Sequence, residues 1–244
     1  MDGVALCSRF SIATNRLEFC GPSGAEAVLY RAITEGTDLA LARDRLRRFE
    51  ALLPYLELIG RKHGRDPFDL DVVRAYWIGN DLLDSFERRD FVELLELLTR
   101  RGLPRSLARR LLEHLPEHPI PHHAFHVTFV GVGNVTGHVP TTLANMDACR
   151  PGWGDVVRTD GATLTLRCRP LEIVGGRLAL GSERTTEVRF DPRVLPGVEK
   201  GDTVALHWST PALALDADDA RSLARYTRLS LDAANEALPG LGVL

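Results

Sequence analysis

Apolar side chains between residues 24 and 114 recur every three or four positions, the spacing that places them on one face of an α-helix. This pattern predicts four helical segments, over residues 39–56, 69–83, 86–101 and 104–113. Asp69 is a typical N-cap residue and Gly102 is a typical helix terminator, so both agree with these limits. Residues 1–22 lack the helical spacing and are interpreted as irregular.

Three prolines between residues 116 and 121 interrupt the helical pattern, and the chain after them is rich in β-branched and aromatic residues. Residues 126–130 (His-Val-Thr-Phe-Val) are therefore predicted to form a strand. Six further strands are predicted over residues 155–159, 162–168, 171–174, 177–180, 185–190 and 203–208. Asp-Gly at 160–161 and Gly-Gly at 175–176 are typical hairpin turns. The last helix is expected after Asp216, because two more aspartates in its first turn complement the helix dipole.

These elements predict an α+β protein with two domains. A helical domain covers residues 1–118, and a small β-barrel domain with a C-terminal helix covers residues 119–244. Short strands separated by tight turns at regular spacing are typical of such barrels. The predicted strand at 126–130 joins the two domains, and ligand sites are often found at such boundaries.

The composition is that of an ordinary globular protein, with 244 residues, 44% of them hydrophobic and 26% charged. A net charge of −3 favours neither nucleic acid nor an anionic membrane as a partner, and no apolar run is long enough to span a bilayer. The four cysteines are too widely spaced to form a metal-type pair, and the N-terminus lacks the pattern of a secretory signal. We therefore expect a cytoplasmic protein with free thiols that acts on a small molecule, with a homodimer left open.

The most distinctive local pattern is a group of three histidines, His122, His123 and His126. If the segment from residue 122 onward is extended like a strand, His122 and His126 point to one face and His123 points to the other. Acid/base catalysis needs only one of them beside a carboxylate. Metal binding needs a further donor, such as His138, His207 or a carboxylate. A third interpretation is that these histidines bond to backbone or water at the edge of a sheet.

Three further residues are candidates for catalysis or binding. Cys149 becomes a nucleophile or a thiolate ligand if Arg150 favours its ionised form, and Cys20 is a similar candidate. Glu18 interrupts an apolar stretch, and a carboxylate in an apolar wall suits a general acid or base. The alternatives are that the cysteines are small buried hydrophobes and that Glu18 is exposed in a loop.

One predicted helix carries Tyr76, Trp77 and Asn80. Trp77 and Asn80 are three positions apart and share a helix face. Aromatic walls beside an amide can hold a planar ligand or stabilise a cation. Core packing is the alternative for Trp77, whereas an amide inside an apolar helix needs hydrogen-bond partners.

Three short motifs follow one another in the C-terminal part: Cys-Arg-Pro-Gly at 149–152 before a strand, Gly-Asp at 201–202 before a strand with His207, and Leu-Asp at 215–216 before an acidic helix start. In these motifs the chain resembles the hydrogenase maturation chaperones of the HypC/HupF type, although Cys149 is internal here and follows the initiator methionine there. The resemblance implies a small β-barrel with a C-terminal helix. It also implies that Cys149 binds or hands over an iron fragment, assisted by His207 or His126, with a hydrogenase large subunit as partner.

The whole chain also resembles an uncharacterised family of actinobacterial type, in which Cys-Gly-Pro, Ala-Tyr-Trp-Ile-Gly-Asn and His-His-x-x-His segments precede such a barrel. A fainter resemblance, without a diagnostic motif, is to the Pictet–Spengler cyclases of bacterial alkaloid biosynthesis. It implies a cofactor-independent cyclase or lyase of secondary metabolism that condenses a tryptophan-like amine with a carbonyl compound and uses no metal. This is our first hypothesis, with the chaperone as its alternative. Its catalytic residues are His126, His122, Glu18 and Cys149. Its substrate-binding residues are Trp77, Tyr76, Asn80, His123, Cys20, His207 and Trp208.

Overall fold

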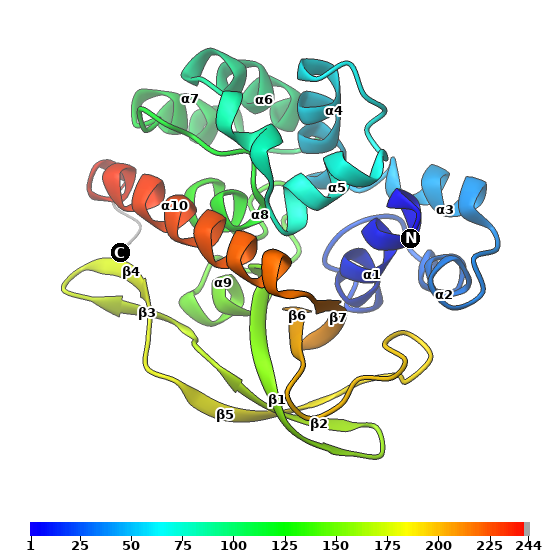
Figure 1. The fold of residues 1–244 in the computed structure, drawn as a ribbon. Helices are drawn as coiled ribbons and strands as arrows, with labels where there is room; N and C mark the ends of the chain where they lie inside the picture. The colour runs from blue at the N-terminus through cyan, green and yellow to red at the C-terminus, as the bar shows by residue number, and fades with distance from the viewer. Residues whose placement is uncertain (242–244) are drawn as a thin grey trace.

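The computed structural model describes the backbone of residues 1–241 and the side chains of residues 1–237. A group of helices is followed by a sheet and then by one long helix (Figure 1). The elements before the sheet are α1 (Gly3–Arg16), α2 (Glu26–Thr34), α3 (Leu39–Leu46), α4 (Leu52–Lys62), α5 (Leu70–Trp77), the 3-10 helix η1 (Asp81–Ser85), α6 (Arg88–Arg100), α7 (Arg105–Glu113), α8 (His123–Phe125), the π-helix η2 (His126–Gly131) and α9 (Leu143–Cys149). The remaining elements are β1 (Gly152–Asp160), β2 (Thr163–Cys168), β3 (Leu171–Val174), β4 (Arg177–Leu180), β5 (Arg184–Arg189), β6 (Thr203–His207), β7 (Thr210–Leu215) and α10 (Ala217–Leu241).

The larger sheet has the strand order β5-β2-β1-β6-β7, and its neighbouring strands are antiparallel. Both predicted hairpins, β1–β2 and β3–β4, are confirmed. The β3–β4 hairpin pairs only with itself among the described residues, and it packs against α9 and α10. In that part of the chain no ladder joins β5 to β7, so the sheet is open. The α+β class is therefore confirmed, whereas the described residues form no closed barrel.

Helix α1 corrects the expectation that residues 1–22 are irregular. Asp2 caps it by accepting a hydrogen bond from the Val4 N–H at 2.8 Å. The helix is buried nearly all round, between α2, α3, α5 and the strands β6 and β7. Buried polar positions such as Ser8 and Ser11 hide the helical spacing of its apolar residues, and Ser8 satisfies its hydroxyl by donating to the Val4 carbonyl at 2.8 Å.

The main hydrophobic core contains residues from both sides of the proposed domain boundary at 118/119. Phe10 and Tyr55 of the helical part belong to the same buried cluster as Leu213 and Tyr226. Helix α10 begins at Ala217, as expected, and lies between the helical layer and the sheet (Figure 1). It packs against α8, η2, β4 and β7. The boundary itself stays a prediction, but the segment around α8 is enclosed by both halves of the chain.

Candidate metal centre

The segment with the three histidines is helical, so the strand predicted at 126–130 is wrong. His122 is the N-cap of α8, and its Nδ1 accepts a hydrogen bond from the Ala124 N–H at 3.2 Å. The chain continues directly into η2, in which every residue is buried. An apolar run that is buried on all sides has no periodicity that distinguishes a helix from a strand, and here tertiary packing overrides the β propensity. In a helix, His123 and His126 are three apart and share a face.

A small cavity of about 60 Å³ lies on that face. Its walls come from α1, the chain between α1 and α2, residues 49–52 at the start of α4, α5, the α8–η2 segment, residues 132–139 after η2, the end of α9, and the end of β6 with the turn that follows it. His123 and His126 enter the wall from α8 and η2, Cys149 from the last residue of α9, and His207 from the last residue of β6. The fold thus gathers in one place residues that are far apart in the chain.

Three of these side chains converge on one point. The Cys149 sulfur lies 3.6 Å from His123 Nε2 and 3.7 Å from His207 Nε2. The three donor atoms all lie within 4.8 Å of one another, and all three residues are buried. One thiol has one proton, so Cys149 can donate to only one of the two nitrogens. Two imidazoles and a thiol with this convergence form a candidate metal centre.

The other nitrogen of each imidazole is held by a hydrogen bond. His207 Nδ1 donates to the carbonyl oxygen of Phe10 in α1 at 2.6 Å. His123 Nδ1 lies 2.7 Å from the hydroxyl of Tyr76 in α5. Metal-ligating histidines in proteins are usually oriented in this way, because the second hydrogen bond fixes the ring and its tautomer.

Burial keeps the three groups neutral in the absence of a cation. It raises the pKa of the Cys149 thiol well above its usual value and lowers the pKa of His207 to about 4. The pKa of His123 is lowered well below the usual value, first by burial and then by the neighbouring histidines. A thiolate–imidazolium pair is therefore disfavoured, whereas a bound cation would favour the thiolate.

His126 borders the same cavity without joining the three ligand atoms. Its Nδ1 lies 3.0 Å from the Tyr55 hydroxyl, and its ring stacks at 5.8 Å and 17° on the ring of His123. Burial lowers the pKa of His126 to about 4, so it is a neutral base near pH 7.

Two tryptophans enclose the centre. Trp77 stacks on Phe10 at 4.8 Å and 12°, and its ring lies 4.4 Å from that of His123 and 5.0 Å from that of His207. Trp208 lies in the turn between β6 and β7 and has a positive φ of 51°. Its ring centroid is 4.7 Å from that of Phe19. Their indole N–H groups are buried and have no hydrogen-bond partner among the described side chains and backbone.

The chain matches the family described as "Family of unknown function (DUF6390)" over residues 1–240. The chain belongs to this family. No curated protein and no solved structure shows a significant match. Membership in the DUF6390 family covers both the helical part and the sheet, and it leaves the resemblances to chaperones and cyclases unconfirmed. Among the described residues, no helix combines the length and the apolar character that crossing a membrane requires.

Most of the predicted site residues do meet at this cavity. The structure brings together in its wall His123, His126, His207, Cys149, Cys20, Tyr76, Trp77 and Trp208. Cys20 and Cys149, which no sequence pattern places together, both line it, and the Cys20 thiol donates to the Glu50 carboxylate at 3.4 Å. Their roles in binding and catalysis stay predictions.

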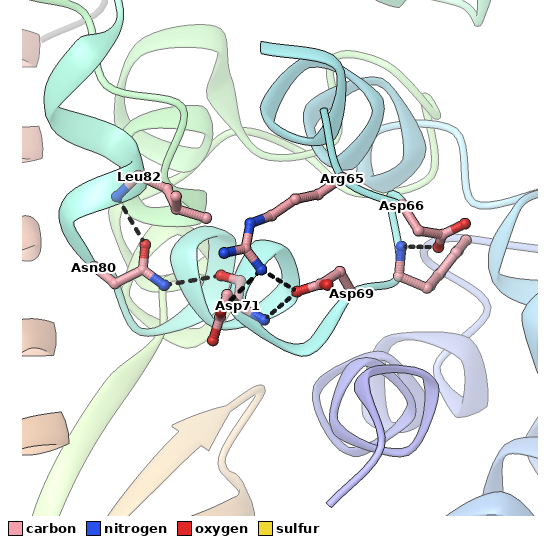
Figure 2. A network of polar contacts seen from close by, with 7 residues as sticks. Arg65, Asp66, Asp69, Asp71, Asn80 and Leu82 are labelled. Atoms are coloured by element: carbon pink, nitrogen blue, oxygen red, sulfur yellow. Dashed lines mark hydrogen bonds and ion pairs between the residues drawn. The ribbon is translucent and has the colours of Figure 1, made fainter. Parts of the chain in front are cut away.

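Three predicted residues lie elsewhere. His122 is fully buried away from the cavity and its ring lies against Tyr226. Glu18 is exposed in a turn with a positive φ of 58°, so the expected apolar wall around it is absent. Asn80 is the N-cap of η1 and not part of an apolar helix, because its Oδ1 accepts from the Leu82 N–H at 3.1 Å and its amide donates to the Asp71 carbonyl at 2.8 Å (Figure 2).

Figure 2 also shows the polar contacts that Arg65 makes near Asn80. Arg65 bridges Asp69 and Asp71 at 3.3 and 3.0 Å, and Asp69 caps α5 as the sequence predicted (Figure 2). These ion pairs are solvent-exposed and carry no sign of a binding site.

Sequence reasoning missed Tyr55, Ser11 and Thr14. Ser11 and Thr14 enter the cavity wall from α1, which was not expected to be a helix. Tyr55 stands in a continuous apolar stretch of α4, and a buried tyrosine hydroxyl needs a hydrogen-bond partner. The need for such a partner could have marked Tyr55 as a candidate site residue, although it does not identify His126 as the partner.

Proposed function

We propose that this protein is a metal-dependent enzyme that holds one divalent transition-metal ion between His123, Cys149 and His207 and acts on a small molecule in the adjoining cavity. In a tetrahedral zinc site, bonds of about 2.3 Å to sulfur and about 2.0–2.1 Å to nitrogen place these two ligand atoms about 3.5–3.6 Å apart. The separations of 3.6 and 3.7 Å found here are close to that value. Each of these two separations therefore suits an ion bound between the sulfur and a nitrogen, and this observation carries the proposal.

The donor set also suits catalysis better than a structural site. One thiolate and two imidazoles are ligands that zinc and iron(II) accept. Structural zinc sites usually have four protein ligands, whereas catalytic sites have three and keep one position open. The three residues here all line the cavity, so the open position of a bound ion would face it. This proposal departs from the expectation of no metal.

The cavity residues supply the rest of the chemistry. A bound ion supplies Lewis acidity toward an oxygen atom of a ligand at the open position. His126 has its Nδ1 engaged by Tyr55, so Nε2 is the nitrogen left to exchange a proton with a cavity ligand. Trp77 and Trp208 exclude water and lower the local dielectric constant, which strengthens these electrostatic interactions.

The cavity size restricts the substrate. A volume of about 60 Å³ accommodates roughly two water molecules. We therefore favour hydration, hydrolysis or elimination on a substrate with a few non-hydrogen atoms. The condensation of a tryptophan-like amine with a carbonyl compound stays a prediction, and it requires that the cavity wall open to admit an indole.

The chaperone alternative also uses Cys149 as a metal ligand and stays a prediction. Cys149 is only 8% exposed and lines a small cavity. Transfer of an iron fragment to a client protein needs an accessible thiol, so the wall would have to open for this function too. The presence of His126 in the wall of the same small cavity favours the enzyme.

Metal analysis of the purified full chain tests the proposal. We expect one zinc or iron ion per chain, and a cobalt(II)-loaded protein with the thiolate-to-cobalt absorption of a cysteine ligand. Cys149→Ser and His207→Gln should each lower metal affinity by at least about tenfold, in the range known for lost ligands and their partners.

Cys20→Ser is the matched control, because it removes a thiol from the same cavity but not from the three ligand atoms. It should leave the metal content and the cobalt spectrum unchanged. A wild-type protein that binds no transition metal above the level of Cys149→Ser would overturn the proposal.

A further inference from the structure

A second and larger hollow lies on the other side of the α9–β1 connection. This groove has a volume of about 730 Å³, within the range of about 300–1,000 Å³ that is usual for small-ligand sites. It is bordered by α9, β1, the connection between β2 and β3, β5 and β6. Ala148 and Ser209 line this groove, whereas Cys149 and Trp208 line the metal cavity, so the two sites lie back to back.

Arg150 is the buried cation of the groove. Only 4% of its side chain is exposed. Its Nε and Nη2 donate to Asp147 Oδ1 at 3.0 and 2.8 Å, and Nη2 also donates to the Arg169 carbonyl at 2.7 Å. Asp147 Oδ1 in turn accepts from the Leu171 N–H at 2.8 Å, so the carboxylate is shared among several donors. These contacts fix the plane of the guanidinium.

One donor of this fixed guanidinium has no partner. Among the described residues, Arg150 Nη1 makes no hydrogen bond. This atom is also not fully enclosed by other protein atoms. It lies beside Gly152, where an added Cβ would be 3.7 Å from Nη1. Arg150 and Gly152 both line the groove. The absence of a side chain at Gly152 leaves room for a ligand atom beside Nη1.

The groove carries an excess of positive charge. Arg169 and Arg184 border it together with Arg150, against the carboxylates of Asp147 and Glu187. The two outer arginines are more than half exposed, and their ion pairs to residues outside the groove are loose, at 3.4 Å for Arg169 and 3.9 Å for Arg184. Such side chains can turn toward an anion at little cost. A buried guanidinium with an unused donor is the usual anchor for an oxyanion.

Trp153 adds an aromatic wall to the same groove. We propose that this groove binds a small molecule that carries a carboxylate or phosphate group, with Arg150 Nη1 as its anchor, Arg169 and Arg184 at its mouth and Trp153 beside the body of the ligand. The site is separate from the metal centre and does not depend on the function proposed for it.

Calorimetric titration of the full chain tests this inference. The probes are inorganic phosphate, phenyl phosphate, acetate and benzoate at constant ionic strength. We expect saturable binding. The affinities of the phosphate pair (inorganic phosphate and phenyl phosphate) and of the carboxylate pair (acetate and benzoate) show which anion the site prefers. The aromatic member of the preferred pair should bind more tightly and should quench tryptophan fluorescence, and Trp153→Phe should remove that quenching.

Variants locate the site. Arg150→Gln should lower affinity at least tenfold, and Gly152→Val should do the same by filling the space beside Nη1 while leaving every charge in place. Gly152→Val decides the matter if Arg150→Gln does not fold, because a Cβ at Gly152 meets only ordinary contacts. Arg184→Gln should weaken binding two- to fivefold, and Arg189→Gln, on the same strand but outside the groove, should not. No saturable binding of any probe, or equal affinity in the wild type and Gly152→Val, would overturn the inference.

Discussion

His207 Nδ1 lies 2.6 Å from the carbonyl oxygen of Phe10. A carbonyl oxygen can only accept, so Nδ1 carries the proton and Nε2 presents its lone pair toward Cys149. Helix α1, at the start of the chain, thus holds a ligand from β6 in the one neutral tautomer that can bind a metal through Nε2. A backbone carbonyl of a buried helix therefore sets the protonation pattern of a candidate metal ligand.

Metal binding should release close to one proton near pH 7. Because burial lowers the pKa of His207 to about 4 and that of His123 well below its usual value, both imidazoles are already neutral. The raised pKa of the Cys149 thiol leaves it protonated, so its proton is the one that must leave. Zinc titrations in two buffers of different ionisation enthalpy measure this number, and apparent affinity should rise about tenfold per pH unit. Release of two or more protons would show that an imidazole is charged in the free protein.

Tyr76→Phe should weaken the metal site, and Tyr55→Phe should not. Tyr76 orients His123 through Nδ1, and loss of such a partner typically lowers metal affinity by about 10–100-fold. The Tyr55 ring also packs on Tyr76, at 5.1 Å between ring centroids, but its hydroxyl bonds to His126, which is outside the three ligand atoms. Competition with a coloured chelator compares the two variants. Equal affinities would contradict the assignment of His123 as a ligand.

The strands β1 to β6 and the β1–β2 and β3–β4 hairpins were predictable because they follow alternation and turn chemistry, whereas β7 was not predicted. Gly175 and Gly176 both have a positive φ in the β3–β4 turn, which is the conformation that Gly-Gly indicates. The location of that hairpin outside the sheet was not predictable. Nothing in residues 171–180 shows that they pack on α9 and α10 rather than between β2 and β5, since both arrangements bury Leu171 and Leu178.

The site was predictable as a set of residue types but not as an arrangement. The sequence indicates His123, Cys149 and His207 as separate candidates, and only the folded chain brings their donor atoms together. Interpreting residues 122–130 as an extended strand paired His122 with His126 on one face. The helical conformation pairs His123 with His126 instead and turns His122 into a cap.

Acid should destabilise the metal-free protein below about pH 6.5. Burial lowers the pKa of His122 from 6.5 to about 3 and that of His126 to about 4, so the unfolded chain binds more protons than the folded one in this range. The stability that the neutral histidines provide is complete above pH 6.5 and is lost progressively as pH falls toward 4. Each should account for about 1 kcal/mol of lost unfolding free energy at pH 5.5.

Urea denaturation at several pH values measures this dependence. His122→Asn is the informative variant, because asparagine can also cap α8 but does not titrate. Its stability should fall less steeply between pH 7 and pH 5 than that of the wild type. An unchanged slope would mean that His122 does not resist protonation in the folded protein.

Gly79→Ala should prevent close packing of α10 on the helical layer. Gly79 has a φ of +95°, and an added Cβ would lie 2.0 Å from Cδ2 of Tyr226, whose hydroxyl donates to Asp84 at 2.8 Å. The left-handed backbone costs about 1–2 kcal/mol for alanine, and the overpacking adds about 1–3 kcal/mol. Gly64→Ala isolates the first contribution, since Gly64 has a φ of +64° and open space around it. Chemical denaturation should therefore show a loss of about 1–2 kcal/mol for Gly64→Ala and a clearly larger loss for Gly79→Ala, and equal losses would show that Tyr226 does not pack against this turn.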